Sequence, residues 1–160
     1  VMVWARTPKA AAELSRQVQE KALKKAYFAV CSGIPTPDAG EMRDLLFKDS
    51  VKQKSFAVIS PRRGVKEALL DYRVLQTAAL NGSPAALVRV ALHTGRFHQI
   101  RCQFATRGHP LLGDTLYNKT PGTFPRQALH SASLSFVHPI TGEPLNFHAP
   151  LPEDMQNLLT

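Results

Sequence analysis

Arg101 is the side chain of this sequence whose position most clearly demands a chemical partner. It lies in the segment 92–114, where the pattern predicts a helix from about Arg96 to Arg107 with Thr94 as its cap. Apolar residues recur along one stripe of this helix, and Arg101 falls in the middle of the stripe. The members of the stripe are Phe97, Ile100, Phe104 and Ala105. A guanidinium is therefore expected on the buried face of a helix, where an unpaired charge costs several kcal/mol.

A buried arginine needs a carboxylate partner, and the usual arrangement is a pair of parallel hydrogen bonds. Asp114 lies just beyond the expected helix and Asp71 lies on an expected strand, so one prediction is a structural pair with either acid. Asp114 is otherwise expected to close the turn that follows the helix. The alternative prediction is a partner in a segment outside this sequence. In that role an arginine keeps a functional aspartate ionised in an apolar pocket, because its charge lowers a pKa that burial would raise.

The charge distribution indicates a polyanionic partner. The 160 residues include 20 Lys and Arg against 12 Asp and Glu, which gives a formal net charge of +8. With 44% hydrophobic residues, the composition predicts one globular domain over residues 1–160 and excludes a disordered chain. No apolar run is long enough to span a membrane. Between Asp71 and Glu143 the only acidic residue is Asp114. A block of one charge sign over that length indicates phosphate binding, and nucleic acid is the leading partner.

The cysteines and histidines do not suggest further chemistry. Cys31 and Cys102 form no CxxC pair and are too few for a disulfide framework, so a reducing compartment, the cytoplasm, is expected. The six histidines have no metal-ligand spacing, and no metal site is expected. They are His93, His98, His109, His130, His138 and His148.

Hydrophobic periodicity predicts helices near the two ends of the chain and a largely antiparallel sheet between them. The first helix is expected to start at Thr7-Pro8 and the last at Pro152. Strands are expected at 25–32, 55–60, 67–75, 85–92, 128–137 and 144–149, with a hairpin turn at Asn81-Gly82. Residues 1–6 are apolar from the first position, as in the middle of a strand, so we expect further polypeptide upstream.

Four ordered motifs resemble a known family. GRFHQIR, GHPLLGDTLY and LHSASLSFVHPITGEPLNFHAPLP resemble motifs of the RluA-type RNA pseudouridine synthases. The stretch VMVWARTPKAAAELSRQVQEKALKKAYFAV resembles the segment that follows the catalytic loop of that family. The likeness covers almost the whole chain and is weakest over residues 33–66. It implies an α+β fold, the pseudouridine synthase catalytic fold, with a mixed, mostly antiparallel sheet flanked by helices.

The resemblance also implies a reaction. Members of this family break the N-glycosidic bond of a uridine in RNA, turn the uracil and join C5 to the ribose C1′, without metal or organic cofactor. The essential residue is an aspartate in a motif of the type H-R-L-D, which this sequence does not contain. Alignment of the family's loop puts that aspartate shortly before Val1. The expectation is that these 160 residues bind RNA but do not turn it over alone.

Individual residues receive roles from the same resemblance. Arg101, in HQIR, matches the arginine that pairs with the catalytic aspartate. Tyr27 matches the tyrosine that stacks on the target base, although a strand tyrosine by itself is most simply a core aromatic. Leu129 and His130 match the third motif and are implied to line the same cleft. His130 is equally well explained as a sheet histidine whose ring is satisfied by hydrogen bonds.

Further polar residues are candidate RNA contacts, with a solvated surface as the alternative for each. They are Arg62, Arg63, Arg96, His98, Gln99 and Arg107. The predicted function is therefore an RNA pseudouridine synthase whose partner is tRNA or ribosomal RNA. The alternative from another class is a noncatalytic RNA-binding module on the same scaffold. The sequence does not indicate an oligomeric state.

Overall fold

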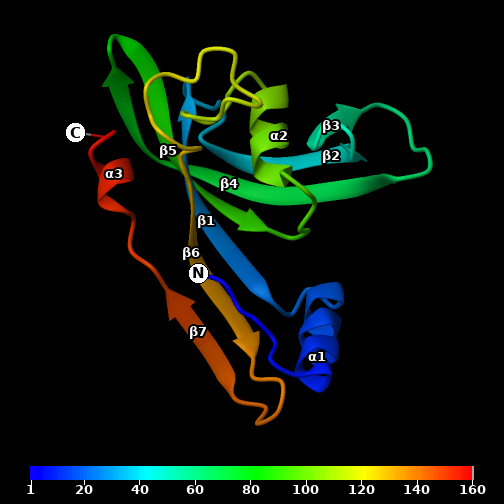
Figure 1. Ribbon diagram of the computed structural model, residues 1–160. Coiled ribbons are helices and arrows are strands. Elements are labelled where there is room, and N and C mark those ends of the chain that lie inside the picture. Colours follow the sequence, from blue (N-terminus) through cyan, green and yellow to red (C-terminus); the bar gives the residue numbers. More distant parts are fainter. Residues whose placement is uncertain (160) are drawn as a thin grey trace.

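A seven-stranded sheet organises the chain in the computed structural model, which describes residues 1–159 (Figure 1). The spatial order of the strands is β3-β2-β4-β5-β1-β6-β7, and each of these neighbouring pairs is antiparallel. The strands are β1 (Lys24–Ser32), β2 (Ala39–Asp49), β3 (Lys54–Val58), β4 (Val65–Leu80), β5 (Ser83–Leu92), β6 (Leu129–Val137) and β7 (Pro144–His148). The helices are α1 (Pro8–Gln19), α2 (Gln99–Thr106) and α3 (Glu153–Gln156). The expected α+β fold with a largely antiparallel sheet is confirmed.

The longest hairpin, β4–β5, forms where the sequence predicts it. Asn81 and Gly82 have φ angles of 48° and 78°, the left-handed values that a tight two-residue hairpin turn requires. The register runs from Leu80 opposite Ser83 to Leu70 opposite Leu92, with one irregularity after Val74. This hairpin forms the centre of the sheet, with β2 paired to one of its strands and β1 to the other.

Helix α1 begins as expected and is attached to the sheet by a buried glutamine. The Thr7 hydroxyl accepts a hydrogen bond from the Ala10 amide at 3.2 Å, and Pro8 is the first helical residue. On the buried face, the Gln17 side chain donates to the Val137 carbonyl at 2.8 Å and accepts from the Val137 amide at 2.9 Å. These two bonds fix α1 against the end of β6. None of the described helices has the length and apolarity needed to cross a bilayer.

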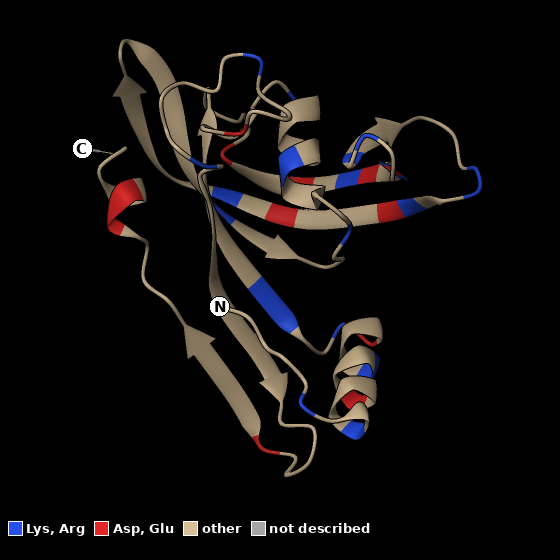
Figure 2. Ribbon diagram, in the orientation of Figure 1, with Lys and Arg blue, Asp and Glu red and all other residues tan. Residues whose placement is uncertain are grey.

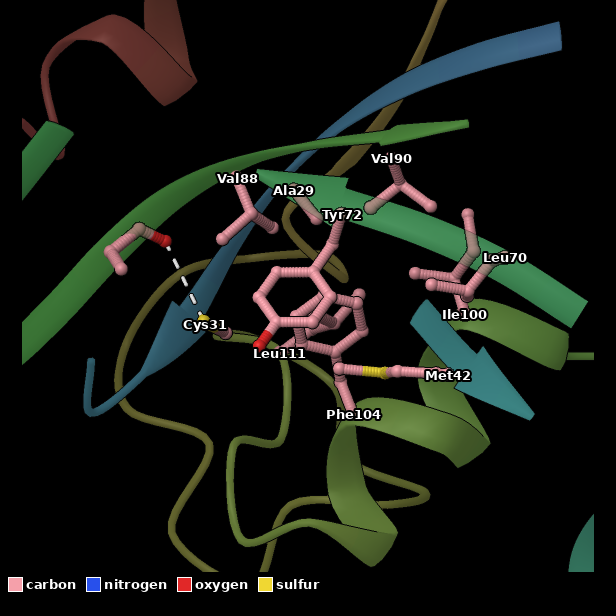
Figure 3. Packing of buried hydrophobic residues seen from close by; sticks show 11 residues of the cluster. Ala29, Cys31, Met42, Leu70, Tyr72, Val88, Val90, Ile100, Phe104 and Leu111 are labelled. Carbon is pink, nitrogen blue, oxygen red and sulfur yellow. Dashed lines mark hydrogen bonds between the residues drawn. The ribbon is translucent and has the colours of Figure 1, made fainter. Parts of the chain in front are cut away.

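Helix α2 covers the main core (Figure 3). Ile100 and Phe104 pack from the helix onto side chains of β2 and β4, and the rings of Phe104 and Tyr72 meet edge to face at 5.9 Å. Met42 and Leu70 in the same cluster are fully buried. A fully buried apolar side chain of this size contributes about 1.5 to 3 kcal/mol, so the cluster holds the helix firmly.

The structure corrects three local predictions. Strand β2 was not expected, because its charged outward residues obscure the alternation of buried positions. Residues 1–6 do not form a strand, although Val1 and Ser131 exchange hydrogen bonds of 2.7 and 2.9 Å. Helix α2 begins at Gln99 instead of Arg96, because His98 adopts a left-handed φ of 52° at the cap position. Thr94 is not the cap.

Gly113 lies in a conformation that only glycine fits. Its φ is +68°, and a Cβ there would lie 1.9 Å from the Arg126 carbonyl oxygen. We expect Gly113→Ala to lower the free energy of unfolding by about 3 kcal/mol or more, measured by urea denaturation, because backbone strain adds to a clash with rigid backbone. The control is Gly142→Ala, where φ is +76° but nothing lies within 4 Å. That variant should lose only about 1 to 2 kcal/mol. Equal losses would show that the contact with Arg126 is unimportant.

Candidate functional site

Tyr27 lines a cavity of about 700 Å³ between α1, β1 and the first residues of the chain. Tyr27 of β1 lies opposite Ser131 of β6 in the sheet register, and both line the cavity. The other walls are mostly apolar and include Val1 and Leu14. Tyr27 also packs against the main core cluster, so its backbone position is fixed. The arrangement offers an aromatic side chain to a flat, uncharged group entering the cavity.

Burial raises the pKa of Tyr27, and hydrogen bonding with the Ser131 side chain offsets only part of that rise. An ordinary tyrosine already titrates near pH 10, so the phenol is neutral at physiological pH. A neutral ring is suited to stacking on a base, and its hydroxyl can still donate or accept a hydrogen bond.

Arg101 and Asp114 form a buried ion pair. The Arg101 Nε donates to Asp114 Oδ2 at 2.7 Å and Nη2 donates to Oδ1 at 2.8 Å, while the Asp114 side chain is 0% exposed. The structural pair with Asp114, one of the two predicted alternatives, is therefore correct. A partner outside the sequence stays a prediction for this arginine, and Asp71 lies 2.6 Å from His93 instead.

The pair is stabilised by further contacts. Asp114 accepts the amides of Leu116 at 3.1 Å and Tyr117 at 3.2 Å, so it also closes the expected turn. Burial raises the pKa of Asp114, but the Arg101 hydrogen bonds and charge and the backbone amides lower it further, and the net pKa is depressed. The same hydrogen bonds raise the pKa of Arg101. Both groups are charged at neutral pH.

Gln99 shapes the loop that precedes α2. It is only 3% exposed, and its Oε1 accepts the Thr94 hydroxyl at 2.8 Å and the Arg96 amide at 2.9 Å. Its Nε2 donates to the Leu69 carbonyl at 3.1 Å. The expectation that Gln99 faces water or RNA is wrong, because the helix starts later than predicted and turns this side chain inward. Gln99 holds Arg96 in position instead.

The predicted RNA contacts near α2 differ in the groups with which they form hydrogen bonds, ion pairs or ring contacts. Arg96 is half-buried, and its Nε donates to the Glu67 carbonyl at 2.7 Å. Arg107 is exposed and pairs with Asp44 at 2.8 Å. The His98 ring is stacked on Phe97, and burial lowers its pKa, so it is neutral at physiological pH.

The remaining predicted contacts lie on other elements. Arg62 and Arg63 are exposed in the β3–β4 turn. Leu129 is half-buried and packs against the same core cluster as Tyr27. His130 is half-buried, with Nε2 3.4 Å from the Ala149 carbonyl. The structure thus brings Tyr27 and Leu129 to one cluster, whereas Arg62 and Arg63 line neither that cluster nor the Tyr27 cavity.

A basic groove of about 330 Å³ adjoins the Tyr27 cavity and was missed from the sequence. Lys25 lines both, and Arg96 lines the groove. The expected strand 25–32 contains Lys25, and the structure begins β1 one residue earlier, at Lys24, well after α1 ends at Gln19.

The described residues offer few other reactive groups. Burial raises the pKa of Cys31 to about 12 and also raises that of Cys102, so both thiols are neutral. Within residues 1–159 no three His, Cys, Asp or Glu side chains are grouped closely enough to hold a metal ion.

Comparison with known proteins shows which proteins the chain resembles. The family model for RNA pseudouridylate synthase matches residues 1–106. The chain is 36% identical over 178 residues to an uncharacterized RNA pseudouridine synthase of Chlorobaculum parvum, covering 99% of this chain and 53% of the relative. It is 36% identical over 167 residues to ribosomal large subunit pseudouridine synthase D of Zymomonas mobilis, covering 99% of this chain and 51% of the relative. The chain thus spans about half the length of the curated relatives it matches.

A solved structure agrees with these relatives. Human RNA pseudouridylate synthase domain containing 1 superposes on the chain with a TM-score of 0.74 at 27% sequence identity. The match covers 91% of this chain and 62% of the human chain.

The Arg101–Asp114 pair predicts a specific dependence of stability on pH. Because the pKa of Asp114 is lowered in the folded state, the pair stabilises the fold above the ordinary carboxyl pKa of about 4, and this stabilisation is lost as the pH falls. We expect Asp114→Asn to lower the free energy of unfolding by about 3 kcal/mol at neutral pH. The difference from the parent protein should shrink as denaturation is repeated toward about pH 3.

The matched control is Asp154→Asn. Asp154 pairs with Arg126 at 2.8 Å, but its side chain is 41% exposed. Solvent screens this pair, so the control should lose less than about 1 kcal/mol. A loss in Asp114→Asn that matches the control, or that stays constant with pH, would contradict a charged buried pair.

Proposed function

Because the chain belongs to the RNA pseudouridylate synthase family, we propose that residues 1–160 are the catalytic domain of an enzyme that isomerises uridine to pseudouridine in RNA. The observation that carries the proposal is the position of Tyr27, in a largely apolar cavity that adjoins a groove lined by Lys25 and Arg96. The cavity suits an uncharged base, and the groove suits the phosphates next to it.

Tyr27 supplies the aromatic surface for the target base. A uridine in structured RNA must leave its stack to react, which costs a few kcal/mol. Stacking on an aromatic side chain returns about 1 to 3 kcal/mol per base. During the isomerisation the N1–C1′ bond breaks, the C5–C1′ bond forms, a proton leaves C5 and N1 takes up a proton. The neutral Tyr27 hydroxyl, beside Ser131, lies at the cavity wall, where it can take the C5 proton as it passes its own proton on.

The nucleophile of the reaction has to come from another segment. None of the carboxylates of residues 1–159 lines the Tyr27 cavity, and Asp114 is committed to Arg101. We assign the role to an aspartate preceding Val1, as the resemblance to a motif of the type H-R-L-D implies. Val1, Met2 and Val3 line the cavity, so polypeptide joined to Val1 enters beside it.

Arg96 is the better candidate for the charge partner of that aspartate. Neither arginine lines the cavity of Tyr27, but Arg101 directs two of its N–H groups to Asp114. Arg96 forms no ion pair within residues 1–159 and lines the groove that shares Lys25 with the cavity. We therefore transfer to Arg96 the role that the resemblance gave to Arg101.

The substrate we propose to test first is ribosomal RNA, because the Zymomonas mobilis relative is named as a ribosomal large subunit enzyme. Transfer RNA is the second substrate to test. An RNA-binding module without catalysis is the competing function, and it predicts affinity for these RNAs with no conversion of uridine.

The decisive assay incubates the full-length protein with unmodified ribosomal RNA and tRNA transcripts and measures pseudouridine by mass spectrometry of the nucleosides. We expect pseudouridine to form, and Tyr27→Phe to lower the turnover by about 10²-fold, since a proton-transferring group contributes that much. Tyr72→Phe is the control, because Tyr72 donates to the Pro37 carbonyl and lies outside the cavity. Binding of both RNAs without pseudouridine would establish the noncatalytic module.

Replacement of each arginine by methionine separates the two roles. Arg96→Met should keep its Tm and lose about 10²-fold or more in turnover, and the acid limb of its pH–rate profile should move to higher pH as the aspartate loses its cation. Arg101→Met should lower the Tm by about 10 °C, because it leaves Asp114 buried and unpaired. Its folded fraction should keep its turnover. The reverse pattern would return the catalytic pairing to Arg101.

A further inference from the structure

Two basic grooves meet at Gly95 and Arg96. The first, of about 330 Å³, lies between the turn after α1 and the loop before α2. The second, of about 320 Å³, lies between that same loop and the β2–β4 part of the sheet. Gly95 and Arg96 line both. The other cationic side chains lining the first groove are Lys21, Lys24 and Lys25, and those lining the second are Lys48 and Lys66.

The charge of the grooves is not neutralised by the rest of the described chain. No acidic residue lines either groove. Glu67, next to Lys66, is paired with Arg43 at 2.5 Å, and Asp71 is paired with His93. The four exposed lysines, Lys21, Lys24, Lys48 and Lys66, form no ion pair within residues 1–159. Figure 2 shows basic residues both on β1 beside α1 and at the β2–β4 end of the sheet.

Gly95 and Phe97 shape the point where the two grooves meet. Gly95 has no side chain, and a Cβ there would lie 3.3 Å from the ammonium at the flexible end of the Lys25 side chain. On the other side, the Lys48 ammonium lies over the Phe97 ring, 4.5 Å from its centre. This contact holds a cation above the floor of the second groove.

The Tyr27 cavity adjoins the first groove, and this sets the order in which an RNA strand would pass the cavity and the two grooves. Lys25 and Leu23 line both the cavity and the first groove. A nucleotide held in the cavity therefore has its neighbouring phosphate at the first groove, and the strand can continue across Gly95 into the second. Arg62 and Arg63 precede Gly64, which lines the second groove, so they extend its positive charge.

We propose that the RNA backbone crosses the loop at Gly95-Arg96, with phosphates bound by Lys21 and Lys24 in one groove and by Lys48 and Lys66 in the other. The proposal rests on the proposed function and deepens it, because it names the path of the substrate on both sides of the reacting nucleotide. Each lysine that neutralises a phosphate releases counterions from the RNA. The affinity for RNA should therefore fall measurably as the salt concentration rises.

The test compares three double variants of the full-length protein that each remove two positive charges. They are Lys21→Gln with Lys24→Gln, Lys48→Gln with Lys66→Gln, and the control Lys9→Gln with Lys119→Gln. Lys9 and Lys119 are exposed and line neither groove. The probe is a fluorescently labelled RNA hairpin with a uridine-containing loop, and Kd is measured over a series of salt concentrations.

Each groove variant should bind the RNA about tenfold more weakly. The slope of its log affinity against log salt should be smaller in magnitude by about 1 to 2, since each single-strand phosphate contact contributes about 0.7 to that slope. The control should stay within about twofold of the parent protein. Groove variants that match the control would overturn the proposal. An effect confined to one groove would overturn the crossing at Gly95.

Pseudouridine formation is measured separately in the parent protein, so the two proposals fail in different ways. If no pseudouridine forms but the groove variants weaken binding, the catalytic function fails and the path stands. If pseudouridine forms and the groove variants bind like the control, the path fails and the function stands.

Discussion

Much of the structure around α2 depends on the burial of one carboxylate. Asp114 is removed from water, and only the two hydrogen bonds from Arg101 and two backbone amides make that burial tolerable. Because Arg101 belongs to α2 and Asp114 to the following turn, the pair fixes the turn against the helix. Tyr117 lies under the Arg101 guanidinium and exchanges hydrogen bonds with the Ser55 backbone, which ties the turn to the sheet.

The first turn of α2 carries Arg101, yet it begins without a regular cap. The helix has no side-chain cap at His98, and Gln99 instead uses its amide to hold the preceding loop. The loop carries Gly95 and Arg96 to the grooves beside the Tyr27 cavity. Two arginines five positions apart thus have opposite surroundings, one in a closed ion pair and one on a surface where its charge is available. Under the proposed function, the same short motif would serve both folding and RNA binding.

The paired acids also shape the electrostatic surface. Several acidic residues are taken up by arginines, as in the pairs of Asp44 with Arg107 and Glu67 with Arg43. The lysines of the grooves are left without such partners in the described chain, so part of the net charge of +8 lies where it can attract an anion. A largely apolar cavity next to such a basic surface suits a nucleotide, because its base is uncharged and its phosphate is negatively charged.

Local sequence patterns were enough to predict several features of this chain. Thr7-Pro8 starts a helix, Asn81-Gly82 forms a hairpin turn, and the apolar stripe around Arg101 requires a carboxylate. The identity of that carboxylate depends on the folded chain, because Asp71 and Asp114 satisfy the same chemical demand and differ only in where the fold places them. The fold also turns the Gln99 side chain inward and places Lys24 and Arg96 in the lining of one groove. Such contacts link residues that lie far apart in sequence, and no periodicity or spacing encodes their distance.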